Sequence, residues 1–406
     1  MDTGDTAWLL MSTALVMIML PGLALFYGGL VRRKNVLSTI MHSFFGLALV
    51  SVVWVIVGFT LAFGPDVGGL GLIGGLDFAF FNNVGLEPSE TYATTVPFVL
   101  FAGFQMMFAA ITPALITGAF AERKRFSAFV LFTILWSIFV YSPLAHWVWS
   151  VDGWLFKLGA LDFAGGTVVH ISSGVSALIV ALLIGRRVVN GDRMEPHDVP
   201  MTVLGAGLLW FGWFGFNAGS AVAANGLAAS AFIVTNTAAA AATITWVLAS
   251  YLHKGKVSVV GAACGAVAGL VAITPASGFV GVGGALIIGL VVGGLCYSAT
   301  LLRSRLKIDD ALDVFAVHGV GGMFGAVATG VFATAAVQEA YTGLLEGNAQ
   351  QLVYQLIAVG ATVAFAVVST FVIVKVVDVI LGIRVSAKDE EMGIDLATHG
   401  EAAYQS

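Results

Sequence analysis

Two pairs of an aspartate and a histidine share one spacing in this sequence. Asp162 precedes His170 by eight residues in DFAGGTVVH, and Asp310 precedes His318 by eight residues in DALDVFAVH. A neutral imidazole donates a hydrogen bond from one nitrogen and accepts one at the other, so paired rings can bind a small polar molecule or relay its proton. The simpler alternative is two separate core histidines, each bonded to a backbone carbonyl group.

The composition places both pairs in a membrane protein. Of 406 residues, 59% are hydrophobic and 10% are charged, which cannot cover a water-facing surface with polar groups. A membrane β-barrel would show short alternating segments instead, and we find no basic patch for nucleic acid. Cys264 and Cys296 lie in apolar segments without metal-ligand spacing, so we expect no disulfide, no metal and no cofactor.

Eleven apolar stretches are long enough to cross a hydrocarbon core, which takes about 20 helical residues. The fold class is therefore all-α integral membrane with eleven transmembrane helices. The stretches lie near residues 7–30, 38–63, 95–120, 126–146, 164–185, 200–219, 227–251, 257–273, 279–302, 312–334 and 350–380.

Positive charges gather in every second loop between these helices and at the carboxyl end, and Lys157 lies on the other side. By the positive-inside rule these loops and the C-terminus are cytoplasmic and the N-terminus is outside, as in a multi-pass protein of the cell inner (plasma) membrane. An odd number of helices is then required. The loop charges are Arg32 to Lys34, Arg123 to Arg125, Arg186, Arg187 and Arg193, Lys254 and Lys256, and Arg303, Arg305 and Lys307.

The first and sixth helices share a glycine and phenylalanine pattern. Gly22-x-x-x-Phe26-x-x-Gly29 matches Gly212-x-x-x-Phe216-x-x-Gly219, and the two Asp–His pairs also lie five helices apart. Such a match predicts an inverted five-helix repeat plus an extra C-terminal helix, with a pathway near the bilayer midplane. We expect one transmembrane domain, 1–383, with halves about 7–185 and 200–334, an extra helix about 350–380, and a cytoplasmic tail, 384–406.

The spacing also estimates how deep the histidines lie. Eight helical residues rise about 12 Å, so two aspartates at opposite edges of a core about 30 Å thick would place both rings near its middle. The rings would then be about 6 Å apart along the membrane normal. Ionisable groups at this depth usually mark a pathway. Because neither carboxylate rings nor a carbonyl filter is evident, the pore suits a small neutral solute, with any cation recognised at its mouth.

Longer motifs resemble a known family. ALDFAGGTVVHISSG at Ala160 to Gly174 closely resembles the ammonium transporter signature, and GWFGFNAGSA, FQMMFAAITPALITGAFAERKRF and DDALDVFAVHGVGG resemble three more segments of the Amt/Mep/Rh family, of bacterial or archaeal Amt type. With the eleven helices and the tail, the resemblance covers essentially the whole chain. It implies a homotrimer in membrane lipid that transports ammonium or ammonia through a pore within each subunit, with methylammonium as a further candidate substrate.

The resemblance also assigns an outer ammonium site to Trp149, with Phe104, Phe108 and Ser220 beside it. A cation over an aromatic face gains about 0.5–2 kcal/mol, and a hydroxyl oxygen accepts an N–H bond that potassium cannot offer. Ammonium would thus be selected without a carboxylate and lose its proton in this vestibule. The alternative for each aromatic residue is ordinary packing or an interfacial belt.

Below this site, the family pattern implies a gate and a pore. Phe108 and Phe216 would be the stacked pair that closes the outer end and excludes hydrated ions, since stripping their water in an apolar tube is costly. His170 and His318 would contact the passing ammonia, as guides or as a proton relay.

Asp162 and Asp313 have structural or cation-stabilising readings. Asp162, just before the glycines of DFAGGT, would cap helix five and stabilise a cation indirectly. Asp313 would order the inner vestibule or simply face a helix dipole. The other histidines of helices and loops, His42, His146, His197 and His253, lack symmetry partners, so we expect them to be structural or solvated.

Two other function classes fit less of the pattern. A membrane ammonium sensor on the same scaffold is the alternative, but we would expect it to carry an appended signalling domain, whereas this chain ends about 20 residues after helix eleven. An intramembrane enzyme would need a nucleophile or a metal triad, and two histidines make neither. We therefore expect no enzymatic activity.

The tail mixes acids with Ile394, Leu396 and Tyr404. Termini fray by default, but these apolar residues favour a tail docked on the inner surface. We expect its acids, Asp389 to Glu391, to meet Arg123 to Arg125 or Arg303 to Lys307. The family resemblance implies that a trimeric PII-type regulatory protein binds this cytoplasmic face.

Overall fold

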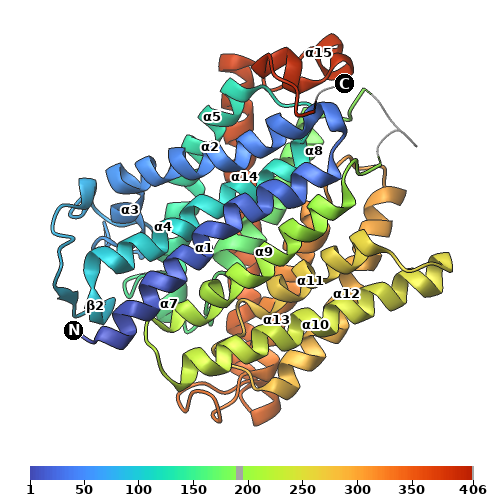
Figure 1. Ribbon diagram of the computed structural model, residues 1–406. Helices are drawn as coiled ribbons and strands as arrows, with labels where there is room; N and C mark the ends of the chain where they lie inside the picture. The colour runs from blue at the N-terminus through green and yellow to red at the C-terminus, as the bar shows by residue number, and fades with distance from the viewer. Residues whose placement is uncertain (189–194, 405–406) are drawn as a thin grey trace.

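The computed structural model describes residues 1–188 and 195–404, so Arg193 of the predicted basic loops lies outside the described residues. Within these residues, ten helices are long and apolar enough to cross a membrane, and α11 (Val259–Ile273) is a shorter apolar helix. The all-α membrane class is confirmed, and α11 corresponds to the short eighth stretch of the prediction. The termini lie at opposite ends of the slanted bundle (Figure 1), as an odd number of crossings requires.

Several spans combine an α-helix with a tighter or wider turn. The first four spans and their short connections are α1 (Thr3–Leu30), η1 (Arg33–Asn35), α2 (Val36–Val53), η2 (Trp54–Gly58), α3 (Phe59–Phe63), η3 (Ala79–Phe81), α4 (Phe98–Ile116), η4 (Thr117–Phe120), α5 (Phe126–Trp136), η5 (Ser137–Tyr141), α6 (Ser142–Trp149) and α7 (Trp154–Leu158). A small antiparallel pair, β1 (Pro88–Ser89) and β2 (Ala93–Pro97), precedes α4.

The remaining elements complete the bundle and the tail. They are η6 (Gly166–Ile171), α8 (Ser172–Ile184), α9 (Val199–Ala218), η7 (Gly219–Ala221), α10 (Gly226–Lys254), α11, α12 (Val282–Arg305), η8 (Phe315–Gly319), α13 (Val320–Phe332), η9 (Leu344–Glu346), α14 (Ala349–Leu381), α15 (Ala387–Met392) and η10 (Asp395–His399).

The two helices that share the glycine pattern, α1 and α9, pack against each other at close range. A methyl group on Gly205 would stand 2.2 Å from the backbone nitrogen of Phe26, and one on Gly212 would stand 2.3 Å from Met19 Cγ. Small residues allow this approach of two backbones in a bilayer. The crossing of α1 and α9 therefore joins the first five spans to those that follow.

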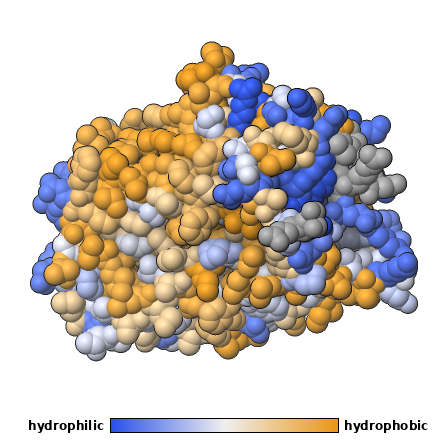
Figure 2. Space-filling view, turned by 45° about the horizontal axis from the view of Figure 1, so that its top comes forward, coloured by the Kyte–Doolittle hydropathy of each residue, from blue (hydrophilic) through white to orange (hydrophobic). Residues whose placement is uncertain are grey.

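The outer surface is apolar over most of its height. Figure 2 shows a broad hydrophobic face with hydrophilic residues gathered toward its ends. Phe44, Leu248 and Val368 are among the exposed apolar side chains, with exposed fractions of 66%, 51% and 63%. Since water would penalise such a surface, lipid is its natural solvent.

The tail docks on the molecule, as expected, but through other partners. The Asp395 carboxylate accepts hydrogen bonds from the backbone nitrogens of Leu37 at 3.0 Å and Ser38 at 2.8 Å, so the tail caps the start of α2. Glu390 is fully buried and pairs with Arg384 at 2.7 Å. Within the described residues no ion pair joins the tail acids to Arg123 to Arg125 or Arg303 to Lys307, so these predicted contacts are wrong. Glu390 pairs with the tail's own Arg384 instead.

Candidate functional site

Asp162 organises the start of the helix that carries His170. One carboxylate oxygen accepts the backbone N–H groups of Gly165 and Gly166, and the other accepts that of Thr167, all at 2.7 Å. The Thr167 hydroxyl also donates to it. These bonds satisfy donors that a helix start leaves unpaired. The structure therefore places Asp162 as a cap of η6, behind the site and not in contact with the cavity below it.

Asp310 repeats this arrangement in the second half of the chain. Its carboxylate accepts the backbone N–H of Phe315 at 2.7 Å, five residues ahead, which is the offset from Asp162 to Thr167. His170 and His318 both lie in single π-helical turns, η6 and η8. Such turns recur at functional sites. Both predicted Asp–His pairs thus consist of a helix cap followed by a histidine in a widened turn.

The two histidines are in direct contact. Their Nδ1 atoms are 3.3 Å apart and their ring centroids 5.4 Å apart, with both rings buried. A hydrogen bond between two Nδ1 atoms requires one to carry the proton and the other to accept it. The rings are therefore opposite tautomers, one exposing an Nε2–H and the other an Nε2 lone pair. Within the described residues, the buried Nε2 of His170 has no partner.

Reciprocal glycines bring the two histidine turns together. Gly174, four residues after His170, packs on the other turn so closely that a methyl group there would stand 2.1 Å from the Gly319 nitrogen. Gly322, four residues after His318, packs on the first turn, where a methyl group would stand 3.0 Å from His170 Cβ. The contact between the two imidazole rings therefore depends on the absence of a side chain at Gly174 and at Gly322.

A narrow cavity borders both histidines. Its volume, about 10 Å³ for the centre of a water-sized molecule, is about what one such molecule needs. Most of the wall is apolar, so a bare ion would lose its hydration without compensation. The lining residues are Met19, Leu23, Phe26, Ile111, Leu115, Val169, His170, Leu209, Trp213, Phe216, Val267 and His318.

Trp213 belongs to this wall and was missed by the sequence analysis. Its ring stacks on His170 with centroids 5.4 Å apart, and its Nε1 donates to the Thr274 hydroxyl at 2.8 Å. Trp213 lies three residues before Phe216, one helical turn along α9. That spacing was a usable signal, since residues three apart share a helix face.

Phe108 and Phe216 meet above the histidines. Their ring centroids are 4.3 Å apart at an interplanar angle of 37°, and Phe216 also lies 6.0 Å from His170. Both rings are buried. Phe104, predicted to face the outer site, is fully buried and packs edge-on against Phe108 at 4.9 Å, so it supports that ring from behind.

Trp149 stands beside the Phe108 ring of this pair. Its indole stands edge-on to Phe108 with centroids 5.9 Å apart, and its Nε1 donates to the backbone oxygen of Asp162 at 3.1 Å. Ser220, at the end of the same helix as Phe216, donates its hydroxyl proton to the Phe216 carbonyl at 2.8 Å. This leaves the Ser220 oxygen free to accept a bond. Both residues remain partly exposed.

Asp313 lies apart from the cavity lining. Its carboxylate pairs with the Arg303 guanidinium at 2.5 Å, and its backbone adopts a left-handed φ of 58°. His42 packs on the Phe129 ring at 4.5 Å, and His146 hydrogen-bonds to Ala62 and Asp66. These contacts favour the structural readings of all three residues.

A buried ionic cluster joins the basic loops and was not predicted. Glu122 pairs with Arg187 at 2.7 Å and with Arg32 at 2.9 Å, and Arg187 also pairs with Asp309 at 2.7 Å. Burial alone would raise the pKa of Asp309, but the hydrogen bonds and charge of Arg187 outweigh it and lower this pKa to about 2. The cluster therefore stays charged at neutral pH and ties four loops together.

The described part of the chain contains no group of three or more His, Cys, Asp or Glu side chains that could hold a metal ion. The site described above offers two imidazoles, aromatic rings and a hydroxyl group.

Known proteins resemble this chain over nearly its whole length. Residues 7–404 match the model of the Ammonium Transporter Family. The chain is 51% identical to an ammonium transporter of Bacillus subtilis, covering 100% of this chain and 99% of that one, and 51% identical to ammonium transporter Amt1 of Archaeoglobus fulgidus, covering 100% of each. The crystal structure of Saccharomyces cerevisiae Mep2 superposes with a TM-score of 0.91 at 40% identity, covering 100% of this chain and 92% of Mep2.

Proposed function

Because this chain belongs to the ammonium transporter family, we propose that it moves ammonium or ammonia through a pore within each subunit. The observation that carries the mechanism is the contact between His170 and His318 beneath a closed pair of phenylalanine rings. The two imidazoles are the polar element of a cavity that is otherwise apolar and has room for about one small molecule.

Recognition begins at the outer side of the phenylalanine pair. The Trp149 indole offers a π face to a cation, and the Ser220 oxygen can accept one N–H bond. The hydrogen bond from Trp149 to the Asp162 backbone fixes the indole. Ammonium gains from both groups, whereas potassium gains from the ring alone.

Movement of ammonium past the two phenylalanine rings favours loss of one of its protons. Phe108 and Phe216 separate the outer site from the cavity, whose wall offers no carboxylate among the described residues. Carrying a charge into this wall costs far more than carrying neutral ammonia. Ammonium therefore gives its proton to a water molecule at the mouth, and neutral ammonia moves on when the rings part.

The histidine pair can hold ammonia in two complementary ways. One Nε2–H donates to the ammonia lone pair, and the other Nε2 accepts an ammonia N–H. The same pair can also relay a proton. The ring with the bare Nε2 takes a proton there and passes its Nδ1 proton to the other ring, which releases its own Nε2 proton, so that the two rings end with their tautomers exchanged. The rings thus act as guides or as a relay with no change in position.

Purified protein in liposomes tests this proposal. An inward ammonium gradient is expected to change the internal pH, with a current if the proton follows ammonia. Equal gradients of potassium are expected to give neither signal. The absence of any flux or current under every gradient would remove the proposal.

A membrane ammonium sensor is the second candidate, because a solved structure named Sensor Amt Protein superposes with a TM-score of 0.89 at 32% identity, covering 97% of this chain. The liposome experiment separates the two candidates. A sensor binds ammonium without sustained flux, whereas a transporter accumulates it.

The proposal extends to surroundings and partners. We infer a multi-pass protein of the plasma membrane with the N-terminus outside, since the basic loops and the tail share one end. Homotrimeric assembly and binding of a PII-type regulatory protein on the cytoplasmic face follow from the family. Crosslinking in native membranes and pull-down with the regulator test these two statements.

A further inference from the structure

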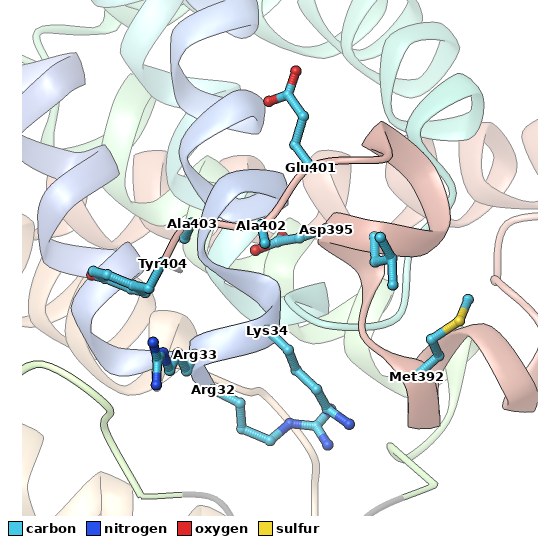
Figure 3. A pocket seen from close by; sticks show the side chains of 10 residues that line it. Arg32, Arg33, Lys34, Met392, Asp395, Glu401, Ala402, Ala403 and Tyr404 are labelled. Atoms are coloured by element: carbon cyan, nitrogen blue, oxygen red, sulfur yellow. The ribbon is translucent and has the colours of Figure 1, made fainter. Parts of the chain in front are cut away.

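A cavity of about 430 Å³ lies between the loop joining α1 to α2 and the docked tail. Figure 3 shows three consecutive cations on one wall and tail residues on the other. Its size falls within the usual range of ligand sites, about 300–1,000 Å³. The lining residues are Arg32, Arg33, Lys34, Met392, Asp395, Leu396, Glu401, Ala402, Ala403 and Tyr404.

The donors of Arg32 and Lys34 on the cationic wall are only partly used. Arg32 bonds to Glu122 through Nε, but its buried Nη2 has no partner among the described residues. The Lys34 ammonium donates to the backbone oxygen of Glu391, a neutral acceptor.

The carboxylates that line the cavity compete little with a bound anion for the donors of Arg32, Arg33 and Lys34. Both Asp395 oxygens already accept backbone N–H groups of α2. Glu401 is exposed to solvent. The Arg33 guanidinium lies 5.1 Å over the Tyr404 ring (Figure 3). Arg33 therefore places a positive charge beside the aromatic wall of the cavity as well.

The position and the lining of the cavity indicate which chemical groups its ligand carries. The first span ends at Leu30 and the second begins at Arg33, so the cations stand where two helices leave the membrane. Met392, Leu396, Ala402 and Ala403 add apolar walls. Arginine forks and lysine together suit phosphate oxygens, and basic pockets at this depth bind anionic lipid headgroups.

We propose that this cavity binds the phosphate group of an anionic ligand, supplied by a phospholipid headgroup or by a soluble phosphate ester, which bridges the α1–α2 loop and the tail. A ligand that requires both walls stabilises the docked tail by mass action. The inference concerns binding at the inner face and is independent of whether the pore conducts.

The test uses the full chain in an uncharged detergent. Phosphatidylglycerol, phosphatidylcholine, glycerol 3-phosphate and inorganic phosphate are titrated separately, and hydrogen exchange is followed over residues 387–404. At ten times the dissociation constant, a ligand that needs the docked tail is expected to slow exchange there about tenfold. Protection by phosphatidylglycerol alone identifies the headgroup as the source, and protection by either soluble anion identifies the ester. Protection by none, or equally by phosphatidylcholine, overturns the proposal.

Matched variants distinguish binding at this cavity from a general effect of the protein's positive charge. Arg33→Gln with Lys34→Gln is expected to weaken binding about 25-fold, at about fivefold for each cation. Lys254→Gln with Lys256→Gln removes the same charge from an exposed loop and should leave the affinity unchanged. Ala402→Phe, which fills the cavity without altering charge, should weaken binding even if the double variant folds poorly. Equal affinity in Ala402→Phe and wild type, or equal losses in both double variants, would overturn the proposal.

Discussion

Gly322 packs directly against His170, so that a methyl group at position 322 would stand 3.0 Å from the histidine Cβ. Because Gly322 lies four residues after His318 on the same helix, this contact sets the distance between the two imidazoles. The backbone after His318 is thus the surface on which the His170 turn packs.

Gly322→Ala is expected to push the turns apart and weaken the contact between the rings. Overpacking of this kind costs about 1–3 kcal/mol of unfolding free energy, and we expect ammonium flux to fall at least tenfold. Flux in liposomes and thermal melting measure the two effects. Gly360→Ala on α14, where a methyl group meets nothing within 4 Å, should change neither, and normal flux in Gly322→Ala would show that ring contact is dispensable.

Replacing both His170 and His318 with leucine is expected to abolish the ammonium-coupled current or make it unselective, because the cavity would keep no polar group able to hold ammonia or pass its proton. Current and internal pH are recorded together. His253→Leu, outside the cavity, is the control. Wild-type current and selectivity in the double variant would contradict the role assigned to the pair.

Trp149→Leu removes the aromatic face at the outer site. Losing one cation–π contact of about 0.5–2 kcal/mol should weaken ammonium recruitment about 2- to 30-fold and reduce its selection over smaller cations. The concentration dependence of flux measures this change. If both concentration dependence and discrimination stay as in wild type, Trp149 is a packing residue.

Asp162→Asn leaves an amide facing the backbone donors of Gly165 and Thr167. Loss of these charge-assisted bonds should lower the free energy of unfolding by about 2–3 kcal/mol and reduce flux through a loosened His170 turn. Asp198→Asn is a matched control, because Asp198 caps α9 through one bond to Met201 and asparagine caps a helix about as well as aspartate, so this variant should cost little. Equal losses in the two variants would remove the special role of Asp162.

Deleting the residues after Ala387 removes Asp395, which caps α2, and buried Glu390. We expect transport to fall while the oligomer remains assembled, and binding of a PII-type regulator to weaken. Transport, crosslinking and pull-down are measured in the same membranes. Asp395→Asn isolates the cap, and full activity with unchanged regulator binding in the truncated form would show an inert tail.

The sequence by itself determined the class and the spans. Apolar length defines a membrane helix because lipid satisfies no backbone group, so the stretches near 7–30 and 350–380 correspond to α1 and α14. The equal Asp–His spacings singled out His170 and His318 as a related pair, and their ring centroids are 5.4 Å apart.

The lateral arrangement was decided by tertiary structure alone. Hydropathy does not distinguish a lipid-facing from a helix-facing surface when both are apolar, so Trp213 remained hidden until α9 was packed against the histidine turns. The partners of Glu390 and the cluster around Glu122 likewise depend on loops far apart in the chain. Close approach at Gly174 and Gly322, which periodicity does not encode, turns two histidines at the right depth into one hydrogen-bonded pair.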